Sequence, residues 1–87
     1  MLVHNRCNSN IFASSREEAL DIGRRFLGEG YTKVETGRYV SKDGFRQMRF
    51  DFTHHNKTTH HINLETYRNE LKPGVRNKII SDIHVFW

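Results

Sequence analysis

Residues 58–66 read TTHHINLET, and the alternation of polar and apolar residues in this stretch decides the fold. Successive side chains of an extended strand point to opposite faces of its sheet. His60, Ile62 and Leu64 therefore share one face, and the two aliphatic residues on it are of a type that proteins bury. The stretch predicts a β-strand whose His60 side packs against the core.

The other face of the predicted strand carries His61, Asn63 and Glu65. An imidazole, an amide and a carboxylate in one row are groups that can bind a ligand or transfer protons. A polar strand face can equally be a face that simply meets water, so the row alone leaves both interpretations open. Residues on the neighbouring strands distinguish a chemical face from one that only meets water.

The composition is that of one small soluble domain. The chain has 87 residues, of which 36% are hydrophobic and 28% charged. No run approaches the ~20 apolar residues of a membrane span, and no signal peptide is visible. The lone Cys7 excludes an internal disulfide and a zinc site of the Cys-pair type. We expect a single domain over residues 1–87 that does not itself bind membranes.

The charge balance favours a polyanionic partner. The formal net charge is +4 and the pI is about 9.6, and six histidines add positive charge as the pH falls. A surplus of this size also occurs in proteins without a nucleic-acid partner. The positions of the cations therefore matter more than their number.

A helix is predicted over residues 14–28, after an N-terminal segment of 13 residues. Ser14 or Ser15 is the expected N-cap, with a glutamate three residues on, and Gly28 provides the stop. Phe12, just before the cap, is a candidate for a hydrophobic staple onto the first turn. An apolar stripe at helical spacing supplies the core face, and its members are Ala19, Leu20, Ile22, Phe26 and Leu27.

Residues 31–87 predict an antiparallel sheet of about four to five strands. Alternating β-branched and aromatic runs cover 31–34, 38–41 and 45–52, and the chain ends on the run 79–87. Asp43-Gly44 between two of these runs is a strong hairpin signal. One N-terminal helix followed by such a sheet indicates an α+β fold, with the helix packed on the sheet.

The same alternation in the flanking strands adds to the polar face. Met48 falls on the core face and Arg49 on the polar one, and in the last strand His84 falls on the polar side. Three adjacent strands about 4.8 Å apart would then bring Arg49, His84, His61 and Glu65 onto one surface roughly 10 Å across.

These groups match the needs of RNA cleavage by the ribose 2′-hydroxyl. That reaction requires a base for the hydroxyl, an acid for the leaving 5′-oxygen and a cation for the developing charge, and it leaves a 2′,3′-cyclic phosphate. His61 and His84 are candidates for the base and the acid, in either order. Arg49 is the candidate phosphate ligand, and Glu65 is a candidate to orient an imidazole.

Metal-dependent hydrolysis is the competing chemistry, because histidines are good zinc ligands. The spacing argues against it, since His60 and His61 diverge on a strand and neither an HExxH motif nor a Cys pair exists. His54 and His55 have no evident fixed partner. We therefore expect no metal site and no cofactor.

Three segments of the chain resemble a known family. They are GRYVSKDGFRQMRF (37–50), HINLE (61–65) and DIHVF (82–86). They are similar to the YxSxDGxRQxR, HVNFE and NIHI segments of bacterial polymorphic-toxin ribonuclease domains, which end contact-dependent inhibition and Rhs-type effectors. The resemblance spans residues 12–87. It implies the fold shared by barnase, EndoU, colicin and RelE-type ribonucleases, with metal-independent cleavage, commonly of transfer RNA.

The resemblance also implies site residues, and those on matching positions are Arg46, Arg49, His61, Asn63, Glu65 and His84. Arg46 and Asn63 thereby become RNA-binding candidates. Lys57 and Tyr67 complete the predicted RNA-binding set. Lys57 lies where this chain has a shorter loop than the family, and Tyr67 is a candidate for base stacking.

The family implies a biological setting as well. Such domains are exported as the C-terminal part of a larger secreted or cell-surface effector and act in the cytoplasm of the target cell. A cognate immunity protein in the producing cell neutralises them. RNA and this immunity protein are the partners that the resemblance implies.

Two other classes of function stay open. A non-catalytic RNA-binding module would use the same basic face with exposed aromatic residues, for which Tyr67 and Phe86 are the candidates. A protein-interaction domain of the immunity type would also be small and α+β, but partners of basic toxins are usually acidic and this chain is basic.

Overall fold

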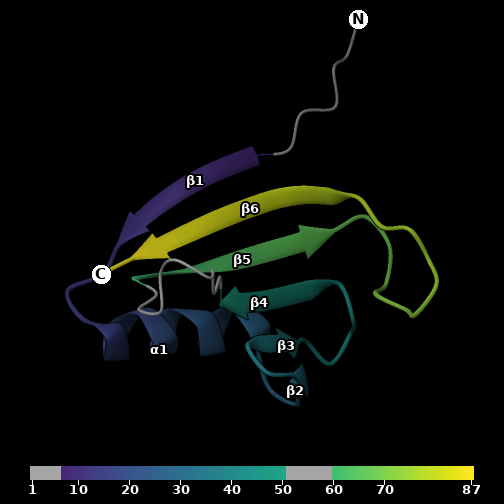
Figure 1. Ribbon diagram of the computed structural model, residues 1–87, viewed down its shortest axis with the longest axis horizontal. Helices are drawn as coiled ribbons and strands as arrows, with labels where there is room; N and C mark the ends of the chain where they lie inside the picture. The colour runs from purple at the N-terminus through teal and green to yellow at the C-terminus, as the bar shows by residue number, and fades with distance from the viewer. Residues whose placement is uncertain (1–6, 51–59) are drawn as a thin grey trace, which may run out of the picture.

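The computed structural model describes residues 7–50 and 60–87. Within these residues the chain forms one helix and a single six-stranded sheet (Figure 1), which confirms the predicted α+β class. The strand order is β1-β6-β5-β4-β3-β2. The elements are β1 (Cys7–Phe12), α1 (Arg16–Leu27), β2 (Thr32–Glu35), β3 (Arg38–Val40), β4 (Arg46–Phe50), β5 (His61–Tyr67) and β6 (Ile79–Phe86).

Helix α1 begins and ends with the capping interactions that the sequence predicts. The Ser15 hydroxyl accepts a hydrogen bond from the Glu18 amide at 3.1 Å, and the Glu18 carboxylate accepts from the amide of Ser14 at 3.2 Å. The second bond goes to the residue before the N-cap, which makes the capping box one residue wider than usual. Gly28 ends the helix at φ 76°, and its amide donates to the Arg24 carbonyl at 3.0 Å.

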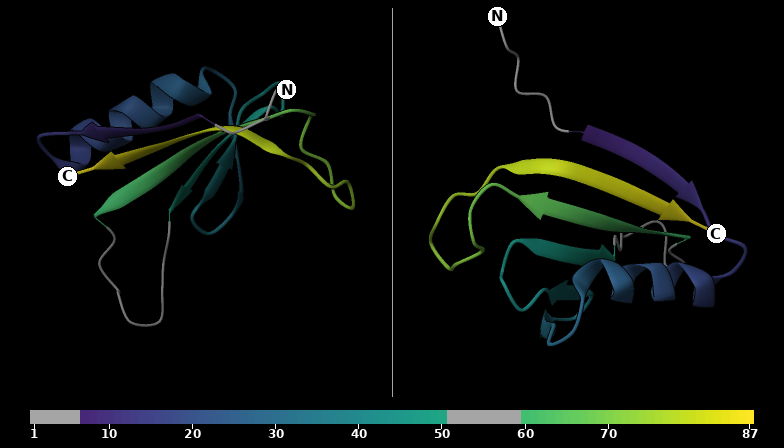
Figure 2. Two further views of the ribbon diagram at one scale, coloured as in Figure 1. Left: turned by 90° about the horizontal axis from the view of Figure 1, so that it is seen from above. Right: turned by 180° about the vertical axis from the view of Figure 1, so that it is seen from behind.

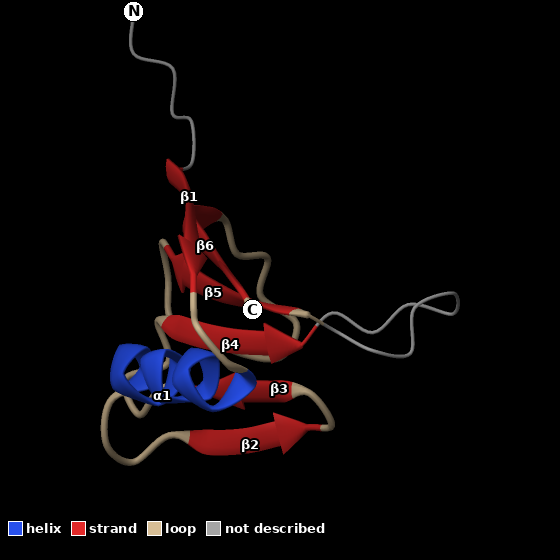
Figure 3. Cartoon of the chain, turned by 90° about the vertical axis from the view of Figure 1, so that its left-hand side faces the viewer, coloured by secondary structure: helices blue, strands red, loops and turns tan. Residues whose placement is uncertain are grey.

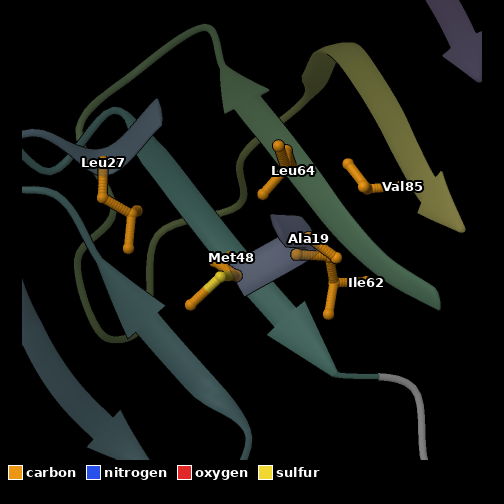
Figure 4. Packing of buried hydrophobic residues seen from close by; sticks show 6 residues of the cluster. All are labelled: Ala19, Leu27, Met48, Ile62, Leu64 and Val85. Carbon is orange, nitrogen blue, oxygen red and sulfur yellow. The ribbon is translucent and has the colours of Figure 1, made fainter. Parts of the chain in front are cut away.

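The core lies between α1 and one face of the sheet (Figures 2 and 3). Helix α1 contacts β4 and β5. Burial of aliphatic and thioether side chains from both layers supplies the main driving force for this packing. Figure 4 shows the buried cluster, which comprises Ala19, Leu27, Met48, Ile62, Leu64 and Val85. The predicted core faces of β4, β5 and β6 are therefore confirmed.

The hairpin between β3 and β4 also forms as predicted. The Ser41 hydroxyl donates to the Asp43 carboxylate at 2.6 Å, and the Phe45 amide donates to the same oxygen at 3.0 Å. These two bonds lower the pKa of Asp43. Gly44 has φ 81°, a left-handed conformation that glycine adopts without steric cost.

Strand β1 was not predicted. Residues 1–13 were expected to lie outside a wholly antiparallel sheet, whereas β1 pairs with β6 in parallel and makes the sheet mixed. Side chains 8–12 are all exposed, so burial leaves no alternating pattern in this stretch. Backbone hydrogen bonds to β6 define the strand, and the sequence does not display them.

His60 lies on the predicted side of the sheet, but the expectation that it packs against the core is wrong. Its side chain is exposed rather than turned into the core, because β5 begins one residue later, at His61. The His60 carbonyl accepts a hydrogen bond from the amide of Trp87 at 3.0 Å, and the two rings lie 6.3 Å apart between centroids, so the residue sits just beyond the end of β5. Phe12 is not a helix staple either, since its ring stacks on Phe86 with centroids 5.5 Å apart.

The described part of the chain contains no helix long and apolar enough to cross a membrane. The predicted strand end at residues 51–52 and the loop histidines His54 and His55 lie outside the described residues.

Gly23 faces the sheet, and this contact gives a test of the helix packing. A Cβ built on Gly23 would lie 2.3 Å from the Met48 sulfur. Alanine normally favours a helix interior over glycine by about 1 kcal/mol. We expect Gly23→Ala instead to lower the free energy of unfolding by about 1–3 kcal/mol, because the core must shift to admit the methyl group.

Urea unfolding of Gly23→Ala would measure this, with Glu17→Ala on the exposed side of the same helix as control. The control should change stability by no more than about 0.5 kcal/mol. A Gly23→Ala protein as stable as the wild type would mean that Met48 moves aside at no cost.

Candidate active site on the polar face

The face of the sheet turned away from α1 carries polar residues in register across the strands. We call it the polar face. Arg49 of β4 pairs with Asn63 of β5, and Asn63 pairs with His84 of β6. Paired residues in an antiparallel ladder place their side chains on the same face. The row continues to Arg38 on β3 and to Asn10 on β1. The prediction that Arg49, Asn63 and His84 lie on the polar face is therefore confirmed.

Two further rows flank this one. On one side Gln47 pairs with Glu65, and Glu65 pairs with Asp82. On the other side His61 pairs with Phe86, which pairs with Phe12 of β1. The predicted catalytic residues, which are Arg49, His61, Glu65 and His84, thus lie on three adjacent strands of one face.

Glu65 is the buried centre of the face, with 2% of its surface exposed. Its carboxylate accepts hydrogen bonds from Gln47 Nε2 at 2.9 Å, from the Tyr67 hydroxyl at 2.8 Å and from Arg49 Nη2 at 3.2 Å. Burial opposes ionisation, but these hydrogen bonds and the charge of Arg49 outweigh it and hold the pKa of Glu65 below its ordinary value. Glu65 therefore serves as an ionised anchor for Arg49.

Tyr67 and Gln47 are held by the same network. Burial and the Glu65 carboxylate raise the pKa of the Tyr67 hydroxyl, which therefore remains a hydrogen-bond donor. Gln47 Oε1 accepts two hydrogen bonds from Arg38, at 2.9 and 2.7 Å, and Arg38 also pairs with Glu35 at 2.8 Å. The network thus runs without a break from β2 to β5, and it defines which end of the Gln47 amide faces Glu65.

The two imidazoles lie next to one another, with ring centroids of His61 and His84 5.9 Å apart. His84 Nε2 lies 3.2 Å from Oδ2 of Asp82, a buried carboxylate on the same strand. The orienting carboxylate of an imidazole is therefore Asp82. Among the described residues, the partners of Glu65 include no imidazole, so the orienting role predicted for Glu65 is wrong.

Asp82 was placed on the polar face by alternation but was not included in the predicted site. The signal was available, because residues two apart on a strand share a face. Asp82 and His84 form such a pair within the DIHVF segment.

The predicted RNA-binding residues have different outcomes. Arg46 lies on the helix side of β4, where it donates to the Phe26 carbonyl at 2.8 Å and contacts Asp43 at 3.3 Å. Its inclusion in the site is wrong. Arg46 shares the parity of the core residue Met48, and it serves the C-terminus of α1 instead.

Asn63 is 3% exposed, so its amide is not a surface contact for RNA. Its Oδ1 accepts no hydrogen bond from the described residues, although it lies in the row of Arg49 and His84. The Tyr67 hydroxyl is occupied by Glu65 and Gln47. Lys57 lies outside the described residues.

A cleft of about 390 Å³ opens beside the network on the polar side. Val40 pairs with Gln47 and so faces this side, and the loop between β5 and β6 forms the other wall. Figure 1 shows this loop at the end of the sheet away from the C-terminus. The lining combines apolar and cationic residues, namely Val34, Arg38, Val40, Leu71, Lys72 and Pro73.

Within residues 7–50 and 60–87, no group of three or more His, Cys, Asp or Glu side chains is placed to hold a metal ion. Comparison with known protein families, curated proteins and solved structures finds no significant match for this chain.

The lowered pKa of Glu65 makes stability depend on pH. Its ordinary value is 4.5. Because the folded value lies lower, the ionised carboxylate contributes stability that is present above about pH 4.5 and is lost as the pH falls through the folded value. We expect Glu65→Gln to lower the free energy of unfolding by about 1–3 kcal/mol at pH 7.

The difference between Glu65→Gln and the wild type should shrink as the pH falls below about 4.5. Urea unfolding at several pH values measures it, and the other carboxyl groups cancel because both proteins carry them. A difference that stays constant down to about pH 2 would contradict an ionised, stabilising Glu65.

Proposed function

We propose that this chain is a metal-independent endoribonuclease toxin that cleaves RNA, transfer RNA in particular, by attack of the ribose 2′-hydroxyl. The observation that carries the proposal is the imidazole pair of His61 and His84, at 5.9 Å between ring centroids, with His61 on the strand next to that of Arg49, whose guanidinium Glu65 holds. A base, an acid and a cation on one face are the groups that this reaction requires.

The two imidazoles transfer the protons in this reaction. One takes the proton of the 2′-hydroxyl, the 2′-oxygen attacks phosphorus, and the other protonates the departing 5′-oxygen, which leaves a 2′,3′-cyclic phosphate. When His84 donates its Nε2 proton to Asp82, the ring is fixed and Nδ1 is the nitrogen that exchanges a proton with the substrate. Asp82 is thus a positioning residue for His84.

Arg49 stabilises the negative charge that develops on the phosphate oxygens. Its guanidinium is a rigid fork of five N–H donors, which matches the oxygens of a phosphate. Glu65 holds this fork through Nη2, and the side chain is 36% exposed. A cation held in place before the reaction stabilises the charged transition state without reorganising.

The toxin setting rests on the resemblance of residues 12–87 to polymorphic-toxin ribonuclease domains. Under this proposal the domain is delivered as the C-terminal part of a larger secreted or cell-surface effector and acts in the target-cell cytoplasm. A cognate immunity protein would neutralise it. The net charge of +4 supports both an RNA substrate and an acidic immunity partner.

We expect the purified domain to cleave RNA in the presence of EDTA, and His61→Ala and His84→Ala each to lose most of this activity while remaining folded. The physical reason is that both rings are needed for proton transfer. His60→Ala is the matched control, because its exposed side chain precedes β5. Gel analysis of total RNA and of transfer RNA measures cleavage.

Activity that disappears with EDTA and returns with zinc or magnesium would refute the mechanism. Binding of RNA without fragments would instead support a non-catalytic RNA-binding module. An active His61→Ala protein beside an inactive, folded His60→Ala protein would refute the assignment of His61.

The two arginines of β4 provide a second test, since they lie on opposite faces of one strand. We expect Arg49→Ala to reduce the cleavage rate by about 10²-fold or more. Arg46→Ala should keep the rate and lower the melting temperature, because it removes a ligand of the helix C-terminus. Equal rates for both variants would remove Arg49 from the site.

A further inference from the structure

Phe12 is 78% exposed at the end of β1. Its ring is not loose, because it stacks on Phe86 with centroids 5.5 Å apart and an interplanar angle of 21°. One ring face is therefore covered by another aromatic ring while the other face meets solvent. A large aromatic ring left in water forgoes most of the burial energy available to it, so packing of the core does not explain this position.

The exposed ring continues into the imidazole pair. Phe86 lies 5.4 Å from His61 between ring centroids and 6.1 Å from His84. The four rings thus form one aromatic cluster over β1, β6 and β5. With strands about 4.8 Å apart, Phe12 lies roughly 10 Å from His61, within reach of a nucleotide next to the bond being cleaved.

The surroundings of the ring favour a nucleobase over a protein surface. Asn10 precedes Phe12 on the same side of β1 and faces His84 in register. The apolar surface on this side is therefore a flat ring bordered by polar groups, rather than a broad aliphatic patch. Exposed, flat aromatic rings are the usual platforms for unpaired bases.

We propose that Phe12, supported by Phe86, is a stacking platform for an unpaired base of RNA that flanks the bond cleaved at His61 and His84. This inference rests on the proposed ribonuclease function and adds a binding subsite to it. Stacking uses the face of the base, which all four bases share, so the platform orders the strand without reading its sequence. Phe86 is the inner ring that fixes the orientation of Phe12.

The test measures binding and cleavage separately. The binding probe is a labelled single-stranded RNA of about 12 nucleotides, 2′-O-methylated throughout so that it cannot be cleaved. Its affinity is measured by fluorescence anisotropy for the wild type, Phe12→Ala and Phe12→Trp. Ile11→Ala is the matched control, because Ile11 is the neighbouring residue on the opposite side of β1 and is 36% exposed.

We expect Phe12→Ala to weaken binding about tenfold and to raise KM for the unmodified RNA by a similar factor, with little change in kcat. Phe12→Trp should bind at least as tightly as the wild type, and Ile11→Ala should bind as the wild type does. Because Phe12 is exposed, both Phe12 variants should keep the wild-type melting temperature.

A scan of abasic substitutions in the probe identifies the stacked base. One substitution should weaken wild-type binding about tenfold and have no further effect on Phe12→Ala, as expected when two changes remove one contact. If Phe12→Ala loses RNA affinity but no abasic substitution causes the same loss in the wild type, the proposal of a stacking platform is refuted. Unchanged RNA affinity in Phe12→Ala would also refute it, including the case in which only self-association is lost.

The outcomes separate this inference from the proposed function. RNA cleavage with wild-type KM in Phe12→Ala would overturn the platform and leave the ribonuclease standing. Binding that depends on Phe12 without any cleavage would support the platform and refute the ribonuclease. A wild-type protein that neither binds nor cleaves RNA would refute both.

Discussion

The constraint on which the polar face depends is the burial of the Glu65 carboxylate. A buried charge is costly unless donors surround it, and here the donors are Gln47, Arg49 and Tyr67. Each donor is thereby fixed in turn, and Gln47 extends the order to Arg38 on β3. The buried anion thus organises β3, β4 and β5 on the side where no helix packs. The same carboxylate also holds Arg49. The interaction that the buried charge requires therefore also positions the proposed phosphate ligand.

The two faces of the central strand β5 obtain their order by different means. Ile62 and Leu64 are buried under α1 by apolar contact, which tolerates many side chains of suitable volume. Glu65 is buried on the other face, where its two carboxylate oxygens are matched by donors of the right kind and direction from Gln47, Arg49 and Tyr67. The polar face is therefore the more specific of the two. Proton transfer is assigned to its edge, where His61 and His84 are less buried.

Alternation predicted the faces of the sheet because burial enforces it, and it placed Met48, Ile62 and Leu64 correctly. It could not reveal β1, whose side chains are exposed, or that β5 begins at His61 and leaves His60 exposed. Arg46 was misplaced because a short motif was transferred whole, although its two arginines lie on opposite faces. The exchange of roles between Glu65 and Asp82 has another cause: parity tells which face a residue occupies, whereas its partner depends on the register between strands.

That register sets two carboxylates opposite one another, since Glu65 pairs with Asp82 across β5 and β6. Like charges directly opposite in a sheet destabilise it, and burial strengthens the repulsion. Arg49 compensates Glu65 from β4, and the ring of His84 lies against Asp82 from the same strand. The side chains that lie beside the two carboxylates are thus those to which we assign phosphate binding and proton transfer, so the charge balance of the sheet and the proposed reaction depend on the same groups.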